Sequence, residues 1–151
     1  QNIMIEGVSI IDLKQIGNEN GKVMHMIRND TKNFTKFGEI YFSTVLHDKV
    51  KGWHRHKKLT SNFVAVFGKI KLVVCDTRSD SKTKGKIEQF FLSQENYKLI
   101  TVPPLVGSGI KGISKETSIV AICTDLPYDE GEIERKSVSD SSFTYDWYKK
   151  I

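Results

Sequence analysis

Short runs of alternating apolar residues, separated by turn residues, constrain the fold of this chain more than any other feature. Residues 62–76 are the clearest case, because two runs of strand length meet at Gly68. After that glycine, Ile70, Leu72 and Val74 recur at every second position, which is the period of a strand whose two faces differ. This segment therefore predicts a β-hairpin.

Runs of the same kind recur along the chain, with almost no helical pattern between them. Strands are predicted at residues 8–13, 23–28, 38–46, 87–92, 97–102 and 118–123, besides the two of the hairpin. The glycines at positions 107, 109 and 112 predict instead a tight, loop-like segment. Many short strands favour an all-β sandwich or barrel. No linker or internal repeat divides the chain, so we expect one domain over residues 1–151.

Composition excludes several classes of protein. With 38% hydrophobic residues in a chain of 151, a folded core is expected. No apolar run approaches the roughly 20 residues that span a bilayer, and the first residues do not resemble a secretion signal. Cys75 and Cys123 each lie in an apolar run, where cysteines are usually buried and reduced. We therefore expect a cytoplasmic protein with no membrane partner.

The formal net charge of +5 permits an anionic partner. The lysines are scattered, however, and the sequence contains no zinc-finger spacing, arginine-rich helix or aromatic–basic RNA motif. We therefore expect no nucleic acid. Two interpretations stay open, a solvated basic surface and a site where a few cations bind a nucleotide diphosphate.

The segment Gly52–Lys58 carries the strongest functional signal. If it is a strand, His54 and His56 point to one face and Trp53 and Arg55 to the other. Two imidazoles facing an enclosed space offer metal ligands or a base that works near neutral pH. This inward-facing pair favours a jelly roll over an immunoglobulin-like sandwich, because the mouth of a jelly-roll barrel often holds a ligand.

A metal site is the less favoured of these two readings. No histidine follows His56, whereas His25 and His47 both precede the pair. A zinc or iron centre built on the pair would lack its usual further ligands. We therefore expect no metal and no other cofactor.

The chain resembles the cupin-type dTDP-4-dehydrorhamnose 3,5-epimerase family and its shorter relatives, over about residues 21–128. The resemblance rests on the order and spacing of five motifs: Lys51–His54, Val66–Arg78, Phe91–Asn96, Val102–Pro104 and Tyr128–Glu132. It implies a cupin jelly roll and an isomerase of polysaccharide biosynthesis that acts on a nucleotide-diphosphate-linked 4-keto sugar. His54 matches the base of that family, which removes a proton next to the ketone.

The resemblance also marks departures from the family. Ser108 stands where the epimerases carry a second histidine, and Ile122 falls near the position of their tyrosine acid. Ser61 or Asn62 replaces a lysine. A non-catalytic sugar-nucleotide-binding cupin is therefore an alternative. A second alternative is a 3,4-ketoisomerase on a dTDP-4-keto-6-deoxy sugar, since the short ketoisomerases share the Gly-x-His-x-His-Lys-Lys segment.

Roles for further residues follow from this chemistry. Catalysis needs an acid to return the proton, and a donor or cation at the enolate oxygen. We expect His54, His56 and Tyr128 to be catalytic, with Tyr41 as another candidate acid. The expected substrate-binding residues are Arg28, Tyr41, Lys51, Asn62, Arg78 and Lys111.

A homodimer is the expected assembly. Short cupins leave sheet edges and an apolar face that need covering. In the families that the chain resembles, an N-terminal strand pairs with the partner's sheet. The resemblance therefore implies that residues 8–13 cross to the other subunit and bring residues 23–28 beside its active site.

Overall fold

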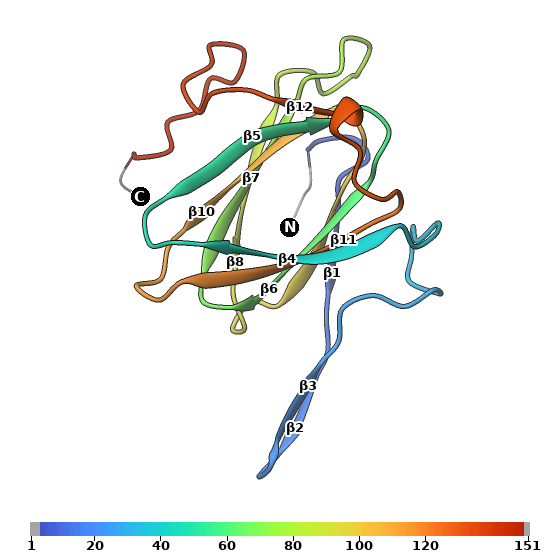
Figure 1. Ribbon diagram of the computed structural model, residues 1–151, viewed down its shortest axis with the longest axis vertical. Helices are drawn as coiled ribbons and strands as arrows, with labels where there is room; N and C mark the ends of the chain where they lie inside the picture. Colours follow the sequence, from blue (N-terminus) through green and yellow to red (C-terminus); the bar gives the residue numbers. More distant parts are fainter. Residues whose placement is uncertain (1–3, 150–151) are drawn as a thin grey trace.

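The fold is built from strands that form two facing antiparallel sheets (Figure 1). The computed structural model describes residues 4–149. In chain order the strands are β1 Ser9–Asp12, β2 Gln15–Asn18, β3 Gly21–Met24, β4 Glu39–Val45, β5 Val50–His56, β6 Ser61–Phe67, β7 Ile70–Asp76, β8 Ile87–Leu92, β9 Lys98–Val102, β10 Val106–Gly112, β11 Ser118–Thr124 and β12 Ile133–Arg135. A single 3₁₀ turn at Glu130–Glu132 precedes β12.

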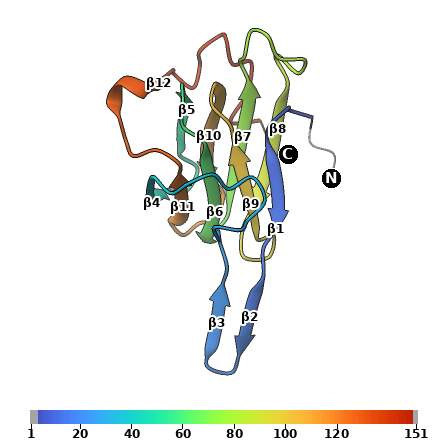
Figure 2. The same cartoon turned by 90° about the vertical axis from the view of Figure 1, so that its right-hand side faces the viewer.

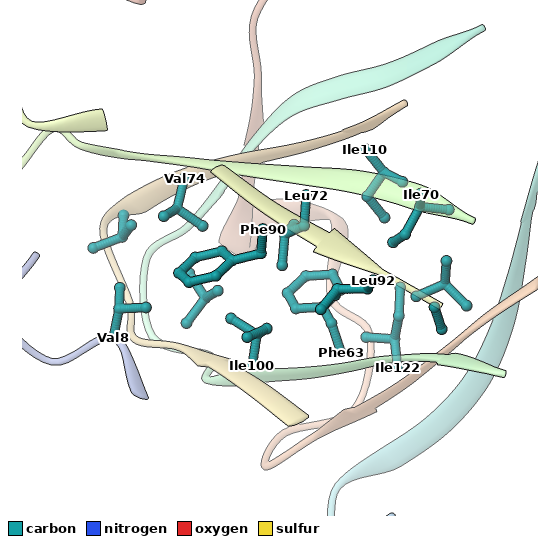
Figure 3. Close-up of a cluster of buried hydrophobic side chains, with 14 of the residues drawn as sticks. Val8, Phe63, Ile70, Leu72, Val74, Phe90, Leu92, Ile100, Ile110 and Ile122 are labelled. Atoms are coloured by element: carbon teal, nitrogen blue, oxygen red, sulfur yellow. The ribbon is translucent and has the colours of Figure 1, made fainter. Parts of the chain in front are cut away.

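The two sheets enclose the hydrophobic core. The first sheet has the order β1–β9–β6–β11–β4 and the second the order β12–β5–β10–β7–β8. Alternate residues of both sheets face inward and pack together, among them Phe63, Leu72, Phe90 and Ile100 (Figure 3). This is a jelly roll, so the predicted all-β fold class is confirmed. The residues that the structure describes contain no helix long and apolar enough to cross a membrane.

The β6–β7 hairpin confirms the reading of Gly68. Its φ of +77° lies in the left-handed region, which disfavours residues with a Cβ atom. A Cβ there would also stand 2.4 Å from the hydroxyl oxygen of Ser118. Both cysteines are free and buried, as expected.

The segment containing Gly107, Gly109 and Gly112 is not a loop, which corrects the sequence prediction. It forms β10, in the middle of the second sheet between β5 and β7. Two of these glycines leave room for aromatic rings on the outer face. A Cβ at Gly107 would lie 2.4 Å from Phe143, and one at Gly109 would lie 2.7 Å from Trp147. Glycine here serves close packing within a strand.

The aromatic residues near the C-terminus cover the outer face of the second sheet. Phe143 and Trp147 are buried against Trp53 and Val73, with Tyr145 beside them. The rings of Trp53 and Phe143 stack with centroids 4.7 Å apart. In Figure 1 this final segment, in red, runs along the outside of β5. The predicted C-terminal aromatic cluster therefore fixes the strand that carries the histidines.

The N-terminal region differs from the expectation in two respects. β1 pairs with β9 of its own chain, whereas we expected residues 8–13 to pair with the sheet of a partner. The strand predicted over residues 23–28 ends at Met24, which pairs with Gln15 at the base of the β2–β3 hairpin. That hairpin projects well beyond the sheets (Figures 1 and 2). It is therefore the segment available for contact with another subunit.

Candidate active site

One cavity lies between the sheets, beside the histidine strand, with a volume of about 350 Å³. Residues from both sheets and from the segment before β12 line it: Glu39, Tyr41, Ser43, Lys51, His54, His56, Ser61, Phe63, Ser108, Gly109, Ile110, Ile122, Tyr128, Ile133 and Arg135. The lining has an apolar part and a part rich in ionisable groups. Such a cavity suits a polar ligand of small-molecule size.

β5 presents its residues as the sequence predicted. His54 and His56 face the cavity, whereas Trp53 is completely buried on the other side. Arg55 also points away, and both oxygens of Glu134 accept hydrogen bonds from its guanidinium. The peptide bond between Gly52 and Trp53 is cis. The alternation of side chains along β5 places the two imidazoles on the same wall of the cavity.

The surroundings of His54 favour its neutral form. Burial lowers the pKa of His54 from its ordinary value of 6.5, and the charges of Arg135, His56 and Lys51 lower it further. Arg135 is directly opposite His54 in the β12–β5 ladder. A histidine that stays neutral near pH 7 can accept a proton, which is what a general base must do.

His56 has a different neighbour. Its Nδ1 lies 2.7 Å from Oε1 of Glu132, whose side chain is almost completely buried. The other carboxylate oxygen of Glu132 accepts hydrogen bonds from the backbone N–H groups of Lys58 and Leu59. These bonds, with that from His56, outweigh burial and lower the pKa of Glu132. The chain thus holds an ionised carboxylate directly behind His56.

Two tyrosines line the cavity. Tyr41 belongs to β4 of the first sheet and so lies on the wall facing β5. Burial, together with the charge of Glu39, raises the pKa of Tyr41, which therefore keeps its proton at neutral pH. Tyr128 lies at the rim and is largely exposed, and its backbone N–H donates to Oε1 of Glu39. Tyr41 is thus the more enclosed of the two candidate acids.

Lys51 lines the cavity at the other end of β5. Its ammonium donates to the hydroxyl of Ser43, 2.6 Å away, and to the backbone oxygen of Thr44. These bonds connect β5 to β4 across the two sheets. The lysine thereby brings a positive charge to the same cavity as the histidines.

Four other expected binding residues lie elsewhere. Arg28 is in the segment after β3 and pairs with the exposed Asp30. Asn62 faces away from the cavity and accepts a hydrogen bond from Thr101. Neither side chain lines the cavity that holds the two histidines.

Arg78 and Lys111 make structural contacts outside the cavity. Arg78 pairs at 2.9 Å with the buried Asp76 and holds the pKa of that carboxyl well below its usual range. Lys111 donates to the backbone oxygen of Trp147 and pairs with Asp48. Both cations thus have carboxylate partners within this chain.

The sequence did not predict the positions of Glu39 and Ser43 in the cavity wall or the pairing of Glu132 with His56. The signal for Glu132 was weak, because the residue lies in a 3₁₀ turn of only three residues, which has no periodicity that could reveal it. Three positions at which the chain departs from the epimerase pattern, Ser61, Ser108 and Ile122, line the cavity. Within residues 4–149 no group of three or more His, Cys, Asp or Glu side chains is arranged to hold a metal ion.

Comparison with known proteins gives consistent matches. The profile of the family described as dTDP-4-dehydrorhamnose 3,5-epimerase matches residues 2–151. The crystal structure of a dTDP sugar isomerase from Desulfovibrio desulfuricans is 39% identical with a TM-score of 0.93, and the match covers 95% of this chain and 92% of that chain.

Two curated proteins are also similar over almost their whole length. The probable low-salt glycan biosynthesis epimerase Agl13 of Haloferax volcanii is 29% identical, with 97% of each chain covered. The spore coat polysaccharide biosynthesis protein SpsL of Bacillus subtilis is 24% identical, over 95% of this chain and 97% of its own.

Proposed function

We propose that this chain, which belongs to the dTDP-4-dehydrorhamnose 3,5-epimerase family, epimerises a nucleotide-diphosphate-linked 4-keto sugar at a carbon next to the ketone. Its similarity to Agl13 and SpsL supports a place in the synthesis of a glycan or polysaccharide. The observation that carries the proposal is the position of His54, a partly buried histidine with a lowered pKa on the wall of a cavity of suitable size.

His54 is the proposed base. A carbon next to a ketone is acidic because the negative charge left by its proton spreads onto the ketone oxygen. His54 takes that proton, the C–H electron pair forms a carbon–carbon double bond, and the carbonyl pair moves to oxygen. Burial keeps the imidazole neutral and ready to accept the proton.

Tyr41 is the proposed acid. Inversion of a carbon requires that the new proton arrive on the face opposite the one from which the old proton left. Tyr41 lies on the first sheet and His54 on the second, and the raised pKa of Tyr41 keeps the phenol protonated. Tyr128, at the rim of the cavity, is the alternative donor.

Lys51 and Arg135 are the proposed cations for the diphosphate. Both line the cavity, and neither is enclosed in the core. Arg28 remains a candidate for the cavity of a second subunit, because it follows the projecting β2–β3 hairpin. Asn62, Arg78 and Lys111 are not included among the proposed ligands of this cavity.

A 3,4-ketoisomerase is the second candidate. The observation that favours it is that His54 and His56 project from the same face of one strand. Two imidazoles on one side of the sugar can take the proton from C3 and deliver one to C4, while the C3 hydroxyl loses its proton and the C4 oxygen gains one through the enediol; this moves the ketone without using the opposite wall.

The proposed assembly is a homodimer formed through the β2–β3 hairpin. Ile16 and Val23 on that hairpin are 59% and 62% exposed, and Phe42 on the outer face of the first sheet is 65% exposed. Apolar side chains exposed to this extent on a projecting hairpin and on a sheet face suit an interface between identical chains.

Proton NMR in heavy water separates these functions. The protein is incubated with a panel of nucleotide-linked 4-keto-6-deoxy sugars, and the position and configuration of deuterated carbons are determined. Epimerisation predicts deuterium at an inverted carbon next to the ketone, and ketoisomerisation predicts a shifted ketone. Tight binding with no deuterium in any sugar would contradict both enzymes and favour a binding protein.

A further inference from the structure

The pair formed by His56 and Glu132 is more constrained than an ordinary surface contact. Glu132 is only 8% exposed, and it comes from the 3₁₀ turn that leads into β12. Its Oε1 lies 2.7 Å from Nδ1 of His56. Its Oε2 lies 2.8 Å from the backbone nitrogen of Lys58 and 2.9 Å from that of Leu59. Both oxygens are therefore committed to defined partners.

The partners determine where the proton of His56 lies. A backbone N–H can only donate, so Oε2 must accept from both Lys58 and Leu59. An ionised carboxylate has no proton to give, so Oε1 must accept as well. Nδ1 of His56 then has to carry a hydrogen. In the neutral ring this leaves Nε2 without one.

We propose that Glu132 is a positioning residue, which fixes the Nδ1–H form of His56 and presents Nε2 to the cavity for proton exchange with the sugar. This inference rests on the proposed function, but the state of the imidazole can be measured without substrate. His54 has no such carboxylate contact among the described residues. The two histidines of β5 are therefore set for different roles, although they have the same side chain.

The exchange that we propose takes place at the ketone oxygen. As His54 removes the proton from carbon, negative charge develops on that oxygen. Once Nε2 of His56 has taken up a proton, it gives that proton to the oxygen, so that a neutral enol forms and the ring returns to the Nδ1–H form. When Tyr41 protonates the carbon, the enol O–H returns its proton to Nε2. Glu132 holds the Nδ1 proton throughout and balances the charge of the protonated ring.

A purely structural role for Glu132 makes a different prediction. If the carboxylate only held the backbone at Lys58 and Leu59, any side chain with an acceptor at Oε2 would serve. Glu132→Gln tests this, because it keeps the shape of the side chain. The amide oxygen must face the two backbone donors, so the NH₂ group faces His56. It then donates to Nδ1, and the ring has to carry its hydrogen on Nε2.

Nitrogen-15 NMR of the histidine rings reads this directly. The spectra are recorded without substrate at about pH 8.5, above the usual pKa of histidine, and assigned with His56→Gln. We expect the Nδ1–H form for His56 in the wild type and the Nε2–H form in Glu132→Gln. The wild-type spectrum alone decides the first point if the variant proves unstable. An Nε2–H form in the wild type, or an unchanged form in a folded variant, would overturn the proposal.

Activity gives a second test with a matched control. In Glu132→Gln, we expect kcat for deuterium uptake to fall by about 10²-fold, the scale of a general acid–base contribution, with KM changed by less than about threefold. Glu134→Gln is the control, since Glu134 lies in β12, two residues after Glu132, and pairs with Arg55 on the side facing away from the cavity. It should keep the wild-type rate and imidazole form. Full activity in Glu132→Gln would refute the role. If no sugar exchanges in the wild type, the proposed function fails, while the NMR result still decides the positioning.

Discussion

Replacing Phe143 by alanine tests whether the C-terminal segment holds the histidine strand in place. Phe143 is 4% exposed and stacks on Trp53, with ring centroids 4.7 Å apart and planes inclined by 14°. Its ring also fills the space above Gly107, a residue that has no side chain of its own to fill that space. The substitution removes this ring from between two parts of the fold.

The expected cost follows from burial. Removing a buried phenylalanine costs about 3–5 kcal/mol. The segment around Phe143 has no regular secondary structure and can partly collapse into the gap, so we expect the lower end, about 3 kcal/mol. For a protein of this length that loss lowers Tm by about 6–12 °C. Activity per folded molecule at low temperature should persist, because Phe143 packs on the face of β5 opposite the cavity.

Urea unfolding followed by tryptophan fluorescence and circular dichroism measures the effect. Phe67→Ala is the control, because Phe67 ends β6 and is largely exposed, and its loss should cost less than about 1 kcal/mol. A loss below 1 kcal/mol in Phe143→Ala, or an equal loss in both variants, would show that the aromatic cluster does not hold this sheet as we argue.

Three further predictions concern the site and the assembly. The acid limb of kcat/KM should lie below pH 6.5, because burial lowers the pKa of His54 and the base works only when it is neutral. Arg135→Gln removes a nearby positive charge and should therefore move this limb to higher pH. A limb that stays at the same pH in the variant would refute the prediction. His56→Ala should reduce an epimerase by about 10²-fold but leave a ketoisomerase almost inactive, as measured by product NMR. Val23→Asp should convert the proposed dimer to a monomer in sedimentation, whereas a wild type that is already monomeric at micromolar concentration would rule the dimer out.

The sequence predicted those parts of the fold that a pattern within one segment determines. The alternation in residues 62–76 has a period of two and a glycine at the turn, and the hairpin forms there. The inward direction of His54 and His56 followed from the same period. In both cases the pattern lies within the segment itself, so the structure of the segment can be predicted without knowledge of the neighbouring strands.

The predictions from the sequence were wrong or incomplete where contacts between distant segments determine the structure. Gly107 and Gly109 predicted a loop because glycine usually marks one, but the rings of Phe143 and Trp147, which lie 36 and 38 residues later in the chain, require glycine at these strand positions. The pairing of Glu132 with His56 joins residues 76 positions apart, and no pattern in the sequence near either residue predicts it. The position of β1 likewise depends on its pairing with β9, and no periodicity within residues 8–13 shows which strand will be its neighbour.

The proposed role of His54 as the base is tested most directly by the rate of deuterium uptake from heavy water by the 4-keto sugar on which the wild type acts. His54→Ala is compared with the wild type at equal concentration, after circular dichroism and melting curves have shown that both are folded. We predict that the variant binds the sugar and that the uptake falls to the uncatalysed rate. Uptake at a substantial fraction of the wild-type rate in the folded variant would contradict it.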